Sequence, residues 1–216
     1  MLTSKHYIPI LRWKEAEKGG LRQLRPEAKK TITPLIELIM PRPRGEITLL
    51  KQKTPAELLT ESVALFKENL PKIPDEILKC WGEGAVFVDC HLIDSSVRAV
   101  AMEKILSQGE ELNIFMIPVI NIVPVVGLDS DLNTRKTAID FAKKNKNGLC
   151  LRILRSDLNQ ELLPTQIKEF LHKNGLREQD VDLIIDLQVV GADDESQTIS
   201  KLIDQKIPNL NNWRNF

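Results

Sequence analysis

Glu37, Asp89 and Asp186 each follow a short apolar run in this sequence of 216 residues. If the runs are strands of one sheet, the three carboxylates converge, and such a set can hold a hard cation such as magnesium or manganese. A metal ion held there polarises a phosphoryl oxygen or activates a water molecule. The alternative is that each carboxylate pairs with a neighbouring arginine or lysine and only balances charge at the mouth of the fold.

Basic side chains occupy the same kind of position in the sequence. Arg12 and Lys14 follow the first apolar run, and Arg152 follows the fifth. Arginine binds phosphate or carboxylate groups through two parallel hydrogen bonds, and lysine supplies a compact positive charge. Carboxylates and bases on one rim suit a phosphorylated ligand, with Arg12 and Arg152 as ligand-binding residues. The same bases are also the pairing partners that the alternative requires.

His91 and Asn121 complete the candidate residues. His91 lies two positions after Asp89, so the two side chains point the same way where the strand ends. This pair indicates acid–base chemistry, with Lys14 as a second proton carrier, or else a structural hydrogen bond. Asn121 follows the most apolar run, residues 114–120, and either orients a ligand amide or phosphate or caps the next turn.

These residues share their position because the chain alternates apolar runs with helix-like segments. The runs cover residues 7–11, 33–36, 85–88, 114–120, 149–151 and 181–185. Strands that alternate with helices predict an α/β protein with a parallel sheet covered by helices. Such sheets place their functional groups beyond the carboxyl ends of the strands, which is where the candidate residues fall.

The number of units predicts a TIM-like β/α barrel of parallel strands, truncated after about six β/α units. A closed barrel of eight units usually needs about 250 residues. Residues 212–216 resemble the start of a seventh strand, and residues 1–216 are expected to form a single domain. The first and sixth strands would then have open edges. We expect these edges to cause self-association, or the fold to depend on further C-terminal sequence.

Composition narrows the class of protein. Apolar residues make up 42% and charged residues 28%, and 30 basic residues balance 30 acidic ones, which argues against a general polyanion binder. The loop Arg42-Pro43-Arg44 could bind nucleic acid, but the zero net charge and the lack of interleaved aromatic residues favour a solvated loop.

The sequence also bears on the compartment. No run approaches the roughly 18 apolar residues that a membrane span needs. The first six residues lack the apolar stretch of a secretion signal. Cys80, Cys90 and Cys150 are widely spaced, and two of them fall in or beside expected strands. We expect reduced core thiols in a cytoplasmic protein.

The same segments closely resemble the bacteriophage and bacterial "beta protein" family. The resemblance covers the whole chain and rests on six ordered stretches, residues 7–14 with Glu17, 32–37, 87–92, 148–152, 180–187 and 210–214. It implies a setting rather than a reaction, because the family is associated with phage and with mobile or defence-linked bacterial genes. Family members also continue past Trp213-Arg214, which implies further strands.

Two functions follow as hypotheses. The first is a component that binds a ligand or a protein partner in phage–host conflict, with its site at the carboxyl edge of the strands. The alternative is a metal-assisted hydrolase of a phosphodiester or phosphorylated metabolite. In that enzyme the carboxylates hold the metal, Arg12 and Arg152 bind phosphate, and His91 or Lys14 transfers protons. Fold alone does not choose between the two functions.

Overall fold

A computed structural model describes residues 6–43, 53–109, 120–188 and 193–215 of the chain. Its centre is a sheet of six strands that are all parallel and lie side by side in sequence order. This arrangement confirms the expected α/β class and the parallel sheet. The strands are β1 (Ile10–Arg12), β2 (Leu35–Glu37), β3 (Val86–Asp89), β4 (Ile122–Val126), β5 (Leu149–Leu154) and β6 (Val181–Asp186).

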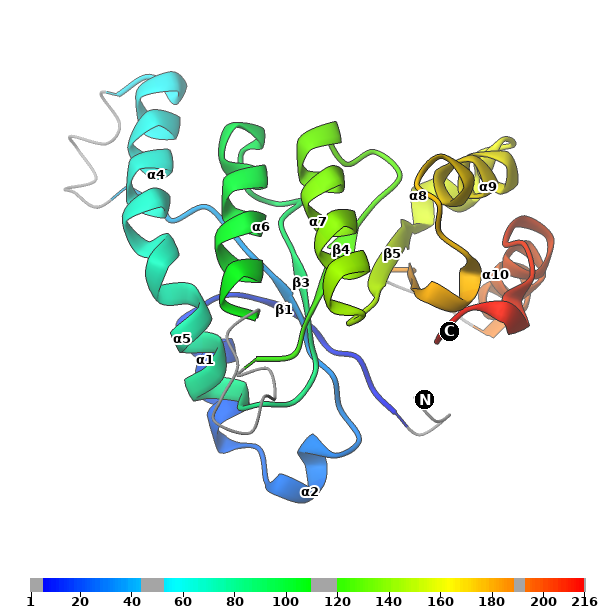
Figure 1. Ribbon diagram of the computed structural model, residues 1–216, viewed down its shortest axis with the longest axis horizontal. Helices are drawn as coiled ribbons and strands as arrows, with labels where there is room; N and C mark the ends of the chain where they lie inside the picture. The colour runs from blue at the N-terminus through cyan, green and yellow to red at the C-terminus, as the bar shows by residue number, and fades with distance from the viewer. Residues whose placement is uncertain (1–5, 44–52, 110–119, 189–192, 216) are drawn as a thin grey trace.

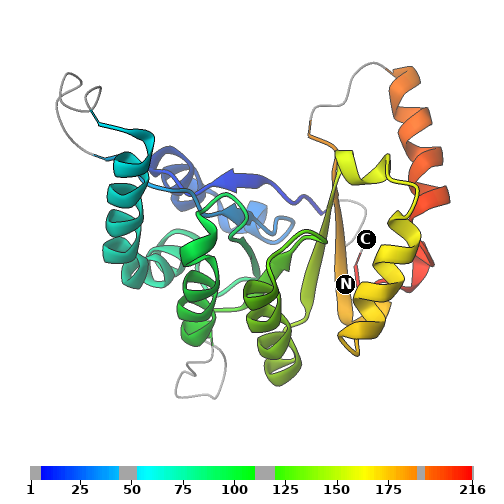
Figure 2. The same cartoon turned by 90° about the horizontal axis from the view of Figure 1, so that it is seen from above.

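Helices cover the outer face of the sheet, which curls into a half-barrel (Figures 1 and 2). α1, α2, α4 and α5 precede β3 in the chain, and α6 to α10 follow it. Short 3-10 turns η1, η2 and η3 connect or extend them. The helices are α1 (Glu15–Gln23), α2 (Pro26–Lys29), α4 (Pro55–Asn69), α5 (Ile73–Trp81), α6 (Ser95–Gly109), α7 (Leu132–Asn145), α8 (Arg155–Leu158), α9 (Leu163–Lys173) and α10 (Asp193–Lys206), with η1 (Leu70–Lys72), η2 (Glu178–Asp180) and η3 (Leu210–Asn212).

The two faces of the sheet build two separate apolar clusters. Successive side chains along a strand point to opposite faces. In β3, Val86 and Val88 join the large cluster under the helices, whereas Phe87 joins a smaller cluster on the inner face. That inner cluster contains residues that are at most 4% exposed, namely Leu35, Phe87, Val123, Val125 and Cys150. The curl of the sheet therefore closes its concave side with side chains, as in the interior of a barrel.

The fourth strand lies later in the chain than the sequence indicated. The strand predicted over residues 114–120 lies mostly outside the described residues, and β4 is formed by Ile122–Val126. Two apolar runs flank Asn121. The sequence analysis took this polar residue as the end of the first run, whereas it precedes the strand formed by the second. Its carbonyl accepts a hydrogen bond from the Val86 N–H, at the start of β3.

The start of a seventh strand is present beside β6. Asn215 forms a parallel bridge with Asp182, and the Leu183 N–H donates to the Asn215 carbonyl at 2.9 Å. Arg214 donates from Nε to Asp182 Oδ1 at 2.7 Å, which ties this segment to the buried carboxylate of β6. The expectation that residues 212–216 begin a further strand is therefore confirmed at Asn215. The described residues form a half-barrel, and closure into a complete barrel is not seen.

The expectation of thiols in the core is met. Cys80, Cys90 and Cys150 are free and buried. Among the described residues, no helix combines the length and the apolar character that crossing a membrane requires. α4 begins with a capping box: Thr54 caps it, Pro55 occupies the first turn, and the Glu57 carboxylate accepts a hydrogen bond from the Thr54 N–H at 2.7 Å.

The capping box of α4 predicts a measurable loss of stability. In Thr54→Ala, the side-chain oxygen that accepts from the Glu57 N–H is lost, so the free energy of unfolding should fall by about 1 kcal/mol. Thr60→Ala is the matched control, because the Thr60 hydroxyl bonds only within the exposed helix, to the Ala56 carbonyl. Urea denaturation followed by circular dichroism measures both. Equal stabilities for the two variants would contradict the capping role.

Candidate functional site

The carboxyl edge of the sheet contains a buried network in which one guanidinium contacts three carboxylates. Arg152 Nη1 lies 2.7 Å from Asp89 Oδ2, and Nη2 lies 2.8 Å from Glu37 Oε1 and 2.5 Å from Asp186 Oδ2. The side chains of these four residues are between 6% and 10% exposed. The sequence therefore identified residues that do come together, although they are separated by up to 149 positions along the chain.

The strand register explains how the network forms. Arg12, Glu37 and Asp89 pair in one row across β1, β2 and β3, so their side chains emerge at the same height. In the same row β4 carries Val125, which pairs with Cys150 of β5. Arg152 lies two residues further along β5, on the same face as Cys150. Arg152 therefore lies beyond the row that contains Glu37 and Asp89, and its long side chain reaches back toward that row.

β6 continues this stagger. Its residue Ile184 pairs with Arg152, and Asp186 lies two residues beyond it on the inner face. The Asp186 carboxylate also accepts from the Gln188 N–H at 2.9 Å, which fixes its orientation. Arg152 therefore sits between the carboxylates of β2 and β3 on one side and that of β6 on the other. It ties together the two halves of the curled sheet.

The electrostatics of the network keep Asp89 and Arg152 ionised. Burial acts to raise the pKa of Asp89, but hydrogen bonds from His91 and Arg152 outweigh it, so the pKa lies below its ordinary value. Burial acts to lower the pKa of Arg152, and the three carboxylates outweigh it, so the guanidinium stays charged. The Nε of Arg152 is buried and has no hydrogen-bond partner among the described residues.

His91 extends the network toward solvent. Its Nδ1 lies 3.1 Å from Asp89 Oδ2, and its Nε2 lies 3.8 Å from Glu37 Oε1. The His91 N–H donates to Asp89 Oδ1 at 2.9 Å, so the main chain as well as the ring is fixed by that carboxylate. The imidazole is 36% exposed, which makes it the member of the group that a ligand can reach. The predicted contact between Asp89 and His91 is present.

The charged side chains that line the pocket at the ends of β1 and β2 are positive. Arg12 is 61% exposed, and its Nε lies 3.9 Å from Glu37 Oε2, a loose contact. Arg12, Lys14 and Arg42 line one pocket of about 590 Å³ at the ends of β1 and β2. Lys14 makes no ion pair with any residue in the described ranges, and Arg42 belongs to the loop that the sequence analysis considered as a nucleic-acid contact.

The same pocket contains apolar residues that the sequence analysis missed. Ile39, Met40, Pro41 and Leu92 complete its lining, and Leu92 is 37% exposed. Each lies within four residues of the end of β2 or β3. Their position just after a strand could therefore have identified them as lining residues. A search for reactive or ionisable groups does not find them, because their side chains carry none.

Asn121 is not part of this site. It immediately precedes β4, so it lies at the amino edge of the sheet, whereas the network lies at the carboxyl edge. The prediction that it binds a ligand together with the strand-end residues was wrong about its location. The reason is that the fourth strand is formed by the apolar run after Asn121 and not by the run before it.

The predicted metal ligands converge on a guanidinium. Glu37, Asp89 and Asp186 each direct one carboxylate oxygen at Arg152, at the point where a metal ion would have to lie. Within the described ranges, no group of three or more His, Cys, Asp or Glu side chains is placed to hold a metal ion. The donor set therefore does not fit magnesium or manganese in this arrangement, and it matches the alternative in which arginine neutralises the carboxylates.

Comparison with known proteins identifies one relationship. A family model described as "Beta protein" matches residues 7–216, which is nearly the whole chain. No curated protein and no solved structure matches the chain. The matched range includes all six strands and each member of the network.

The central position of Arg152 predicts a large effect of its removal. Arg152→Met keeps the length of the side chain but leaves three buried carboxylates without their cation, and the free energy of unfolding should fall by about 3–5 kcal/mol. Arg152→Lys should recover part of this loss, because it restores charge but cannot bridge all three carboxylates. Chemical denaturation gives these values.

The matched control is Arg177→Met. Arg177 pairs with Asp180 at the surface, where the arginine side chain is 69% exposed, so its loss should cost less than about 1 kcal/mol. If Arg152→Met proved no more destabilising than Arg177→Met, the central role of Arg152 would be refuted.

Asp89 predicts a dependence of stability on pH. Because its pKa is lower in the folded chain than the ordinary 3.8, the unfolded chain binds more protons in this range, and stability falls as the pH falls. In Asp89→Asn the decline in unfolding free energy below about pH 5 should be shallower than in the wild type. Asp75→Asn, at an exposed position of α5, serves as the control. Parallel curves for wild type and Asp89→Asn would exclude this contribution.

Proposed function

The chain belongs to the Beta protein family, and we propose that it is a ligand-binding β/α protein whose site lies at the carboxyl edge of its sheet. The ligand is anionic and phosphorylated. It binds in the pocket lined by Arg12, Lys14 and Arg42, beside His91. We place this activity in the setting of phage–host conflict that the resemblance to the family implies.

The observation that carries the proposal is the separation of charge at the rim. The carboxylates of Glu37, Asp89 and Asp186 are at most 10% exposed and already contact Arg152, whereas the side chain of Arg12 is 61% exposed. A ligand that approaches the rim therefore meets cations first. Cations around a concave surface raise the local concentration of anions and speed their association.

The shape of the pocket supports a small molecule in preference to a protein partner. Its volume of about 590 Å³ falls in the range of small-molecule sites, about 300–1,000 Å³. Arg12 and Arg42 can bind phosphate oxygens in pairs, and Lys14 adds a point charge. Met40 and Leu92 offer an apolar surface on which the remainder of the ligand packs. Nucleic acid is less suited, because the part of the chain that the structure describes places no aromatic side chain in this pocket.

The metal-assisted hydrolase remains the alternative function. Its support is the contact of His91 with Asp89 and its approach to Glu37, an arrangement that could transfer a proton. The position of Arg152 argues against it, since a metal ion would have to displace a guanidinium from three carboxylates. Titration with magnesium and manganese therefore belongs in the same experiment as titration with phosphate.

Isothermal titration calorimetry with inorganic pyrophosphate tests the proposal. The wild type should bind pyrophosphate, and Arg12→Ala/Lys14→Ala should weaken binding at least about tenfold, because each lost phosphate contact costs on the order of 1.5 kcal/mol or more. The control Lys168→Ala/Lys201→Ala removes the same charge from exposed positions of α9 and α10. It should bind like the wild type.

The outcomes separate the two functions. Absence of pyrophosphate binding, or equal weakening by both double variants, would overturn the proposed site. Magnesium or manganese binding at millimolar concentration that is lost in Glu37→Gln would instead favour the hydrolase. Metal binding that is unchanged in Glu37→Gln would show that Glu37 is not a metal ligand and would count against the hydrolase.

A further inference from the structure

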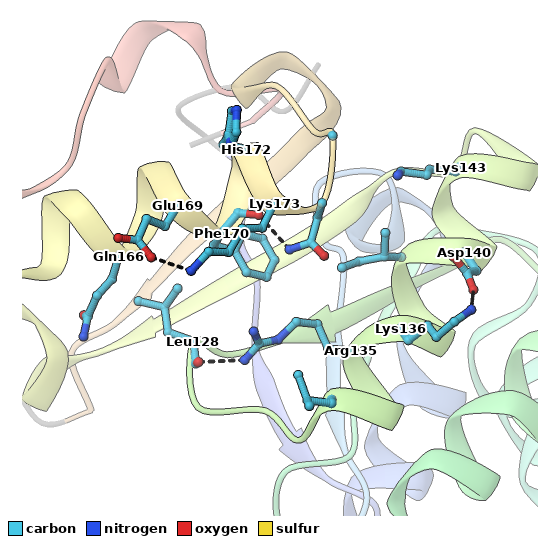
Figure 3. Close-up of a pocket in the computed structure, with 14 residues that line it drawn as sticks. Leu128, Arg135, Lys136, Asp140, Lys143, Gln166, Glu169, Phe170, His172 and Lys173 are labelled. Carbon is cyan, nitrogen blue, oxygen red and sulfur yellow. Dashed lines mark hydrogen bonds and ion pairs between the residues drawn. The ribbon is translucent and has the colours of Figure 1, made fainter.

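A second concave surface lies on the outside of the half-barrel. Its lining residues and the helices that build it differ from those of the rim pocket. It is a groove of about 830 Å³ between α7 and α9, shown in Figure 3. α7 packs along α6 on its other side, as neighbouring helices of such folds do. On the α9 side the groove separates the two helices. We call this surface the α7–α9 groove.

The floor of the α7–α9 groove is apolar. Ile139 of α7 and Phe170 of α9 are each 4% exposed, and Leu128 from the segment after β4 lies beside them. Leu132, in the first turn of α7, also lines the groove and is 78% exposed. A single exposed apolar side chain is common on protein surfaces, so Leu132 matters here because it adjoins the apolar floor. The floor therefore favours an occupant with an apolar face.

The walls of the groove carry an excess of positive charge. Arg135, Lys136, Lys143 and Lys173 face two carboxylates, Asp140 and Glu169, which leaves a net charge of +2. Both carboxylates are already paired along their own helices, Asp140 with Lys136 and Glu169 with Lys173 (Figure 3). Lys143 forms no ion pair with the described residues.

Arg135 keeps one edge of the groove rigid. Its Nη2 donates to the carbonyls of Leu128 and Ser130 at 2.8 and 2.9 Å, and its guanidinium lies 5.7 Å from the centroid of the Phe170 ring. These contacts connect the segment after β4, α7 and α9. An occupant would meet a preformed surface, which lowers the cost of binding.

We propose that the α7–α9 groove docks an acidic amphipathic helix of a partner protein. The apolar face of that helix packs on Leu132, Ile139 and Phe170, and its flanking carboxylates face Lys143 and the outer lysines. A helix fits because side chains of a third helix pack into the space between two others as ridges into grooves. Acidic flanks match the net charge of the walls. RNA is less suited, because its bases bind largely by stacking on aromatic rings and Phe170, the phenyl ring of the groove, is only 4% exposed.

Two synthetic peptides of about 18 residues test the proposal, a length that gives about five helical turns. Both carry leucines at helical spacing on one face, and the remaining positions are glutamate in the first peptide and lysine in the second. Fluorescence anisotropy is measured with the full chain. The acidic peptide should bind at least about tenfold more tightly than the basic one, and binding should weaken as salt rises.

Variants separate the groove from the rest of the surface. Lys143→Glu should weaken binding of the acidic peptide at least about fivefold through charge reversal, and Leu132→Asn should weaken it through loss of apolar contact. Lys67→Glu makes the same charge change on α4, at an exposed position across the molecule, and should leave binding unchanged. Circular dichroism of each variant verifies that it is folded.

Three results would overturn the proposal. The first is that the acidic peptide does not bind or binds no better than the basic one. The second is that Lys143→Glu and Lys67→Glu have equal effects. The third is that a single-stranded RNA of about 12 nucleotides binds the groove more tightly than the acidic peptide, with the same dependence on Lys143, since about 4–16 nucleotides fill a typical single-strand site.

Discussion

The contact of one arginine with three carboxylates is the constraint on which the rest of the site depends. Glu37, Asp89 and Asp186 come from three strands, and buried together without a cation they would repel one another and ionise with difficulty. Arg152 removes that conflict. The net stability of such a network is small, because desolvation of four charges offsets their attraction, yet loss of one member is costly. Its main physical effect is to fix how the strand ends are arranged.

That arrangement decides which charges a ligand meets. With the carboxylates held inward by Arg152, the charged side chains that line the rim pocket are Arg12, Lys14 and Arg42, and the ring of His91 is 36% exposed. If the arginines were buried and the carboxylates exposed, the same residue types would give the rim an acidic surface that suits a cation. The positive lining of this pocket therefore depends on which charges are buried, since the whole chain has equal numbers of basic and acidic residues.

The curl of the sheet also divides the molecule into an inner and an outer surface with different side chains. Inside, alternate residues of the strands fill the concave side and end in the charged network at the carboxyl edge. Outside, helices cover the other face, and where α7 and α9 separate they leave a groove with an apolar floor and basic walls. The rim pocket and the α7–α9 groove share no lining residue, so the two proposed sites can be mutated independently.

The sequence by itself determined the parallel α/β architecture, the family, and the gathering of Glu37, Asp89, His91 and Arg152 at one edge, because apolar runs that end in polar residues report directly on strand ends. It misplaced Asn121, since periodicity cannot show which of two adjacent apolar runs becomes the strand. Only the tertiary structure decided that the carboxylates surround an arginine and not a metal ion. That outcome depends on the stagger between β4, β5 and β6, which raises Arg152 above the row of Asp89. Register depends on how the buried faces of neighbouring strands pack and on the geometry of the connections between them, so it cannot be read from one strand in isolation.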